Sequence, residues 1–249
     1  MEAGPGLPSM STPDVAWEWE ERGGCYRATI ASGPSSSSWL RDTVLKPEIV
    51  RLLGDRSGDR VLDAGTGNGW LFELVNIGER HACDIVKPEN VRSDVAFVQA
   101  NIANLPYPAS HFDAVVASII LCYCEDLDVV AAELHRVTAA AATLVVALVH
   151  PHFYRTGEAL DGDRYMIEAD LSRPERFDIV IGGMAGPFTY YRRSIPDYVN
   201  ALIGAGWELD EMTELFVPRA EYEARFRARD LVRRSTRVPL FVTMALTKP

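Results

Sequence analysis

The fold of this chain is decided by residues 60–70, RVLDAGTGNGW (Arg60 to Trp70). Here a short apolar run ends in an acid, Asp63, and opens directly onto a G-x-G-x-G turn. In this way a buried parallel strand enters a tight turn at which a ligand can lie against bare backbone. The pattern predicts a strand over 60–64 followed by a ligand-binding turn.

Two classes of cofactor use such a turn. Dinucleotide sites have the form G-x-G-x-x-G, in which the third glycine lets the helix approach the strand. Trp70 occupies that third position, and its large indole argues against a turn that binds pyrophosphate. Asp84 follows Gly65 at about the distance at which an acid at the end of the second strand reaches ribose hydroxyls. The turn and Asp84 together therefore indicate a cofactor that carries a ribose.

The same turn, preceded by Val-Leu-Asp, resembles motif I of the class I S-adenosylmethionine-dependent methyltransferases. A second stretch, Asn101 to Ser118, resembles the family's segment that leads from the third strand into the fourth. Where the family commonly has an acid that holds the adenine ring, this chain has Asn101, whose amide oxygen can still accept from an amine. Glu133 to Val137 resembles the helix before strand five, although residues 139–142 replace the Pro-Gly-Gly turn that usually follows.

The resemblance implies S-adenosyl-L-methionine as the cofactor and a Rossmann-like class I methyltransferase fold. In this α/β fold a mostly parallel seven-stranded sheet has an antiparallel last strand and helices on both faces. The residues that the resemblance predicts to bind the cofactor are Asp63, Gly65, Thr66, Gly67, Asp84, Ile85, Asn101, Ile102 and Ser118.

Strand-like and helix-like segments alternate along the chain, which favours a parallel sheet with crossover helices. Strands are expected at 60–64, 81–84, 95–99, 112–118, 143–149, 177–181, 207–216 and 238–246, and helices at 15–22, 39–53, 69–76, 127–137, 196–205 and 221–234. The expected organisation is a disordered N-terminus (1–13), an N-terminal helical cap (14–58) and a methyltransferase domain (59–249) with a substrate-covering insert (150–195).

Candidate catalytic residues follow the long apolar run of the fifth expected strand. His150 and His152 come directly after it, and ligands of open α/β sheets bind beyond the carboxyl ends of the strands. An imidazole there can take a proton from a hydroxyl or an amine near neutral pH, or it can instead cap the strand end. The segment 190–207 resembles one that follows a substrate-covering insert in small-molecule methyltransferases. Tyr190 or Tyr191 is therefore expected either to line the acceptor pocket or to pack on a strand face.

Composition limits the classes of partner. Acidic residues outnumber basic ones by 35 to 25, for a net charge of -10, which disfavours nucleic acid and anionic membranes. The four cysteines lack the paired spacing of a zinc site, so no metal is expected and they are interpreted as reduced thiols of a cytoplasmic protein. No stretch is long and apolar enough to span a bilayer, and the first residues lack the regions of a signal peptide.

These features predict an enzyme that transfers a methyl group from S-adenosylmethionine to the oxygen, nitrogen or carbon of a small-molecule acceptor, with secondary metabolism as one setting. Two alternatives remain open. A methyltransferase-like binding protein without activity would account for Asn101 and the missing Pro-Gly-Gly turn, whereas Gly65, Gly67 and Asp84 argue against it. A nicotinamide-dependent oxidoreductase is disfavoured by Trp70. The sequence identifies neither the acceptor nor the oligomeric state.

Overall fold

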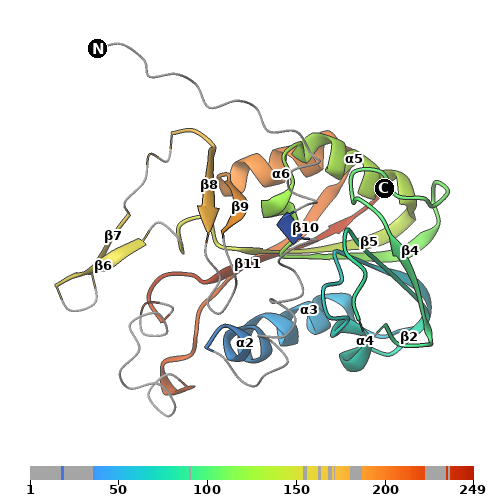
Figure 1. Cartoon of the computed structure of the whole chain (residues 1–249), viewed down its shortest axis with the longest axis horizontal. Coiled ribbons are helices and arrows are strands. Elements are labelled where there is room, and N and C mark those ends of the chain that lie inside the picture. The colour runs from blue at the N-terminus through green and yellow to red at the C-terminus, as the bar shows by residue number, and fades with distance from the viewer. Residues whose placement is uncertain are drawn as a thin grey trace.

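A seven-stranded sheet forms the centre of the molecule, and helices cover both of its faces (Figure 1). The computed structural model describes residues 18–19, 36–89, 91–153, 156–161, 164–167, 170, 172–179, 187–221, 234 and 236–249. The expected disorder of 1–13 lies outside these residues, and so do most of the expected helices at 15–22 and 221–234. No helix in the described part of the chain is long and apolar enough to cross a membrane.

The strands of the sheet follow the order β10-β11-β5-β4-β1-β2-β3. Their bounds are β1 Arg56–Ala64, β2 Ile77–Asp84, β3 Val95–Gln99, β4 Phe112–Ser118, β5 Thr138–Val149, β10 Glu208–Leu215 and β11 Phe241–Thr247. Neighbouring strands from β5 to β3 are parallel, whereas β11 runs antiparallel to both β5 and β10. The predicted class I fold, with its antiparallel last strand, is confirmed.

The order of the strands also locates the binding edge. β1 pairs with β2 on one side and with β4 on the other, so the chain reverses its direction of travel across the sheet after β3. In open α/β sheets, ligands bind beyond the carboxyl ends of the strands at such a reversal. The glycine turn that follows β1 lies at this point.

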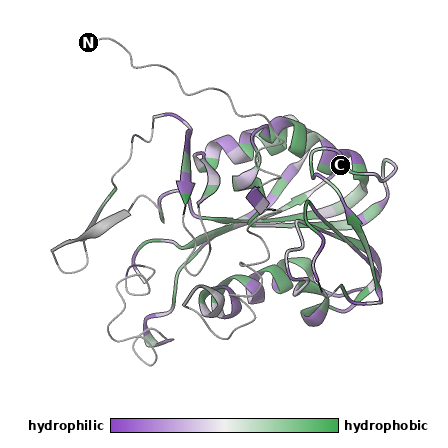
Figure 2. Ribbon diagram, in the orientation of Figure 1, coloured by the Kyte–Doolittle hydropathy of each residue, from purple (hydrophilic) through white to green (hydrophobic). Residues whose placement is uncertain are grey.

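Helices pack their apolar sides on the sheet, as the hydropathy colouring of Figure 2 shows. On one face lie α2 (Ser36–Leu40), the π-helical η1 (Arg41–Leu45), α3 (Lys46–Leu53) and the short α4 (Leu71–Leu74), and on the other lie α5 (Leu127–Val137) and α6 (Ile195–Gly204). α2, η1 and α3 are continuous and contain the predicted helix 39–53. Side chains of these helices belong to the same buried cluster as side chains of the sheet. The division of the chain into an N-terminal cap (14–58) and a methyltransferase domain (59–249) stays a prediction.

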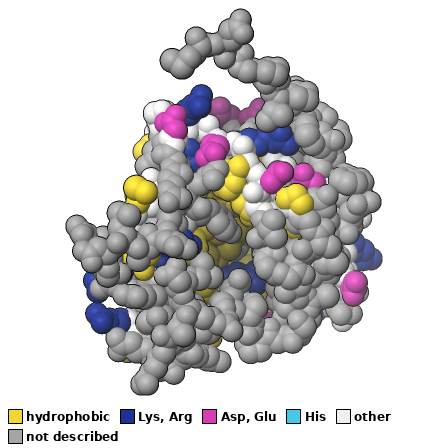
Figure 3. All heavy atoms as spheres, turned by 60° about the vertical axis from the view of Figure 1, so that its left-hand side comes forward, with side chains coloured by type: hydrophobic (Ala, Val, Ile, Leu, Met, Phe, Trp, Pro, Cys, Tyr) yellow, Lys and Arg dark blue, Asp and Glu magenta, His cyan; other side chains and the backbone are white. Residues whose placement is uncertain are grey.

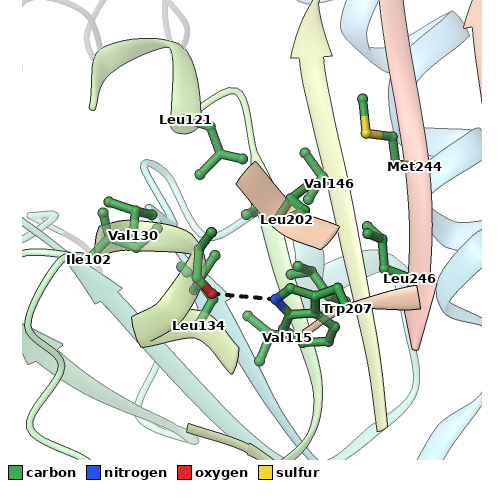
Figure 4. Close-up of a cluster of buried hydrophobic side chains, with 14 of the residues drawn as sticks. Ile102, Val115, Leu121, Val130, Leu134, Val146, Leu202, Trp207, Met244 and Leu246 are labelled. Atoms are coloured by element: carbon green, nitrogen blue, oxygen red, sulfur yellow. Dashed lines mark hydrogen bonds between the residues drawn. The ribbon is translucent and has the colours of Figure 1, made fainter. Parts of the chain in front are cut away.

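The core under α5 and α6 shows why these helices form. Val130, Leu134 and Val137 recur at helical spacing and are buried, and Asp126 caps the start of α5 by accepting from the Val129 N–H at 3.1 Å. Trp207 fills the space beside α5 and donates its Nε1–H to the Ala131 carbonyl at 3.4 Å (Figure 4). Burying each such aliphatic side chain contributes about 1.5–3 kcal/mol.

Several elements differ from their predicted lengths. β5 begins at Thr138 rather than at 143, because residues 138–142 also pair in the sheet, with a register shift near Ala141 at φ +59°. The helix predicted at 69–76 spans only Leu71–Leu74, since Val75 is already extended.

Between β5 and α6 the described strands lie outside the main sheet. β6 (Thr156–Asp161) pairs with β7 (Arg164–Ile167), and β8 (Glu175–Ile179) pairs with β9 (Phe188–Arg192). All four fall within the predicted insert 150–195. The assignment of that segment as a substrate cover stays a prediction.

Candidate active site

The glycine turn is tied to the end of β2. The N–H of Gly65 donates to the Cys83 carbonyl at 2.9 Å, and the N–H of Gly67 donates to Asp84 Oδ2 at 2.8 Å. Gly65, Gly67 and Gly69 have φ values of +77°, +57° and +74°, a region that other residues rarely adopt. The turn therefore depends on glycine for its backbone path.

The first two glycines differ in what a side chain would meet. A Cβ on Gly65 would lie 2.8 Å from Ile120 Cγ1, so packing within the protein already requires glycine there. A Cβ on Gly67 would meet nothing within 4 Å. Ile120 follows Ile119, whose φ of +54° is strained for a β-branched residue. This strained turn brings Ile120 against Gly65 at the end of β4.

Asp84 is held at both of its carboxylate oxygens. Oδ2 accepts from the Gly67 N–H, and Oδ1 accepts from the Val86 N–H at 3.1 Å. A carboxylate oxygen can accept more than one hydrogen bond. The loop after Asp84 is held by Gln99, whose Nε2 donates to the Ile85 carbonyl at 3.0 Å. These contacts fix the Asp84 carboxylate beside the glycine turn.

Asp63 lies behind the turn and is only 2% exposed. Its Oδ2 accepts from Thr66 Oγ1 at 2.7 Å. Burial raises the pKa of Asp63 to about 7, against the opposing effect of the Thr66 hydrogen bond and with a smaller contribution from the nearby Asp84. Asp63 therefore supports the turn from within the core and exchanges its proton near neutral pH.

A cavity of about 270 Å³ opens beyond the carboxyl ends of the central strands. Its described wall consists of Trp19, Gly65, Cys83, Asp84, Ile85, Ala100, Asn101, Ile102, Ala103, Ile120, Tyr123, Cys124, Glu125, Asp126, Val129 and Val130. The wall is mostly apolar, includes three carboxylates and has no Lys, Arg or His among the residues named. Such a wall suits a ligand with a positive charge better than one with a pyrophosphate. Figure 3 shows hydrophobic side chains in a hollow on one face, with acidic side chains nearby.

Five of the residues predicted to bind the cofactor lie in this wall: Gly65, Asp84, Ile85, Asn101 and Ile102. Asp63, Thr66 and Gly67 lie next to Gly65 along the chain and Ser118 ends β4, but these four do not belong to the described wall. Asn101 Oδ1 accepts from the Ala103 N–H at 2.9 Å, which fixes the side chain and leaves its amide N–H groups to donate.

Several residues of the wall were not predicted. Ile120, Tyr123 and Cys124 come directly after β4, so the rule that ligands bind beyond strand ends would have found them. Trp19, from the expected helix at 15–22, was also not among the predicted site residues. No local pattern places Trp19 at the cavity, because its contacts are made with residues more than a hundred positions away.

His150 is almost fully buried, and both of its ring nitrogens have partners. Nε2 lies 3.0 Å from Glu214 Oε1, and Nδ1 accepts from the His152 N–H at 3.3 Å. The ring proton therefore sits on Nε2 and is donated to Glu214. Burial lowers the pKa of His150, although Glu214 acts in the opposite direction. The two histidine rings lie edge to face with centroids 5.0 Å apart.

Tyr190 and Tyr191 are both buried on β9. Tyr190 meets Tyr123 edge to face at a centroid distance of 5.8 Å and so lies one layer behind the cavity wall. Tyr191 lies under the Arg193 guanidinium, 5.2 Å from its ring centroid, and its carbonyl accepts from the Tyr198 hydroxyl at 3.2 Å. These contacts are those of packing residues, and the catalytic role of Tyr190 stays a prediction.

Comparison with known proteins gives one consistent result. Residues 62–146 match a family described as a methyltransferase domain. The demethylmenaquinone methyltransferase of Beutenbergia cavernae is 31% identical over 185 residues, which cover 67% of this chain and 72% of that protein.

Solved structures share the fold. An S-adenosylmethionine-dependent methyltransferase from Mesorhizobium loti aligns with a TM-score of 0.65 and 20% identity over 81% of this chain and 96% of that chain. The 1,6-didemethyltoxoflavin-N1-methyltransferase of Burkholderia thailandensis, solved with 1,6-didemethyltoxoflavin and S-adenosylhomocysteine, aligns with a TM-score of 0.57 and 15% identity over 99% of this chain and 94% of that chain.

Proposed function

This chain belongs to the class I S-adenosylmethionine-dependent methyltransferases, and we propose that its methyl acceptor is a small molecule. The observation that carries the proposal is the cavity that brings the glycine turn, Asp84 and Asn101 to one wall. The relative named for demethylmenaquinone and the structural neighbour that holds 1,6-didemethyltoxoflavin both act on small molecules. The same class of acceptor agrees with the net charge of -10, which disfavours a polyanion.

The residues of the wall fit S-adenosylmethionine. The carboxylate of Asp84 in the cavity wall suits the hydroxyls of a ribose, and the amide of Asn101 beside Ile102 suits the polar edge of an adenine. The open face of Gly67 leaves room for a ligand against bare backbone. Carboxylates without basic residues among the described wall favour a cation over a pyrophosphate.

When bound, S-adenosylmethionine would supply the methyl group of its sulfonium to a nucleophile of the acceptor, with S-adenosylhomocysteine as the leaving group. The protein's task is then to hold the acceptor in the correct orientation and to exclude water. Ile120, Tyr123 and Val130 give the cavity an apolar wall for that purpose. A general base is needed only where the acceptor must lose a proton.

Neither His150 nor His152 belongs to the described cavity wall, so the role of either one as a base stays a prediction. Both nitrogens of the His150 ring are engaged within the protein, with Glu214 and with the backbone of His152. We therefore assign His150 the role of orienting the turn that carries His152. Tyr190 is the weaker candidate because it lies behind Tyr123.

We also propose that the protein works in the cytoplasm, without a nucleic acid or a membrane as partner. The acidic net charge disfavours a nucleic acid or an anionic membrane as partner. Free thiols at Cys83, Cys122 and Cys124 support a cytoplasmic location, since thiols persist in a reducing compartment. The oligomeric state is left open.

The direct test combines binding with turnover. Thermal unfolding is followed with S-adenosylmethionine, S-adenosylhomocysteine and NAD, and a ligand at a hundredfold over its dissociation constant should add about 2.7 kcal/mol of stability. Transfer of labelled methyl groups is then measured on a panel of phenols, amines, carboxylic acids and quinols. Stabilisation by the first two ligands with transfer to one panel class supports the proposal. Binding without transfer to any class favours the binding protein, and stabilisation by NAD alone favours the oxidoreductase.

A further inference from the structure

A buried carboxylate joins two segments that lie far apart in the sequence. Glu18 is 8% exposed, and its two oxygens accept hydrogen bonds from the N–H and the Oγ1 of Thr189, each at 2.8 Å. Thr189 belongs to β9, which pairs with β8 among the described strands. Glu18 thus satisfies the N–H of the buried Thr189.

The next residue, Trp19, stands between this contact and the cavity. Its ring meets Phe188 of β9 in a tilted arrangement at 4.4 Å and Tyr123 edge to face at 5.2 Å, both measured between centroids. Trp19 and Tyr123 both belong to the cavity wall. The hydrogen bonds of Glu18 therefore fix the main chain from which one wall of the cavity projects.

We propose that Glu18 and Thr189 form a latch that holds Trp19 against the cavity and thereby sets how long S-adenosylhomocysteine stays bound. The inference rests on the proposed placement of the cofactor in this cavity. Glu18 is a positioning residue, because it acts through Trp19 and does not itself belong to the described wall. The latch adds two directional hydrogen bonds to the aromatic packing of Trp19 on Phe188 and Tyr123.

The test measures the dissociation rate of radiolabelled S-adenosylhomocysteine in a chase with unlabelled ligand. Glu18→Ala removes both hydrogen bonds, and Thr189→Val removes the hydroxyl while keeping the shape and strand propensity of the residue. Thr189→Val should speed dissociation by about tenfold, the effect of one hydrogen bond to a carboxylate, and Glu18→Ala by at least as much. The double variant should dissociate no faster than Glu18→Ala alone, since both changes remove one contact.

Conservative variants show whether the contact itself matters. Thr189→Ser keeps both donors, and Glu18→Gln keeps an oxygen for the N–H and offers an amide N–H to the threonine oxygen. Both should retain the wild-type dissociation rate. Glu175→Ala is the matched control, because it breaks the 3.2 Å contact with Arg192 in the same two-stranded sheet. It should leave the rate unchanged.

A second readout needs no ligand. Release of Trp19 from Phe188 and Tyr123 should shift tryptophan emission to longer wavelength in Glu18→Ala, and the shift should vanish when Trp19→Phe is added. Equal acceleration by Glu175→Ala, or an unchanged rate in both Glu18→Ala and Thr189→Val, overturns the latch. If Glu18→Ala does not fold, the dissociation rate of Thr189→Val alone tests the proposal, and an unchanged rate in that variant overturns it. Failure of the wild-type protein to bind S-adenosylhomocysteine overturns the cofactor assignment instead.

Discussion

The two sides of the cavity are built in different ways. On the side of β1 to β3, strand ends and backbone groups form the wall, and the decisive contacts join residues close in sequence, such as Gly67 and Asp84. On the side of β9, side chains form the wall, and the decisive contacts join Trp19 to Tyr123 and Phe188. We propose that the first side binds the cofactor that the family shares, and that the second side varies with the acceptor.

The largest expected effect concerns turnover of the acceptor rather than binding of the cofactor. If His152 is the base, His152→Ala should lower turnover about 10²–10⁴-fold with little change in the affinity for S-adenosylhomocysteine. His150→Ala should act through the turn it supports, so its loss should be smaller and partly restored by His150→Gln. Steady-state rates on the true acceptor and calorimetry measure the two quantities. Full turnover in His152→Ala would place the base elsewhere or show that positioning alone suffices.

The next prediction concerns the glycine turn after β1, where backbone groups form the site. Gly67→Val should fill space that is open in the structure and weaken the binding of S-adenosylhomocysteine by about 1–3 kcal/mol, roughly 5- to 150-fold. Gly54→Val is the matched control, since Gly54 also has a positive φ, +68°, and an open Cβ position but lies before β1. Calorimetric affinities that fall equally in both variants would show backbone strain rather than a blocked site.

A smaller effect is expected at the end of β2. Asp84→Ala removes the acceptors for the ribose and for the Gly67 N–H, so affinity for S-adenosylhomocysteine should fall about tenfold or more. Asp94→Ala, which removes an exposed acid beside Arg92, controls for the change in net charge. A loss below about twofold in Asp84→Ala, measured by calorimetry, would remove Asp84 from the site.

The last prediction uses the buried acid behind the turn. With a folded pKa of about 7, Asp63 keeps its proton at pH values where the unfolded chain, with the ordinary aspartate pKa of 3.8, has released it. Its contribution to stability is therefore present at low pH and lost as pH rises toward 7, by up to about 1.4 kcal/mol per pH unit.

Asp63→Asn cannot release a proton and should lack this slope. Urea unfolding between about pH 5 and pH 7 measures the difference in unfolding free energy between wild type and variant. That difference should move steadily in favour of the variant as pH rises. A constant difference would mean that Asp63 is ionised throughout the range.

Features of the fold that depend on residues close in sequence were predicted, whereas features that depend on distant residues were not. The strands at 95–99 and 112–118 and the helix at 127–137 have the predicted bounds, because their patterns of burial are local. The turn and Asp84 were also found, since their contact spans few residues. The extension of β5 to Thr138 depends on pairing with Phe112, and the position of Trp19 depends on β9. Contacts of that range leave no periodic signal in the sequence.

The central claim is that the cavity between the glycine turn and Asn101 holds the cofactor. A crystal structure of the protein with S-adenosylhomocysteine tests it most directly. The account predicts the ribose hydroxyls on Asp84, the adenine beside Asn101 and Ile102, and Trp19 in contact with the ligand. S-adenosylhomocysteine bound elsewhere, or bound in this cavity with Asp84 facing no hydroxyl, would contradict it.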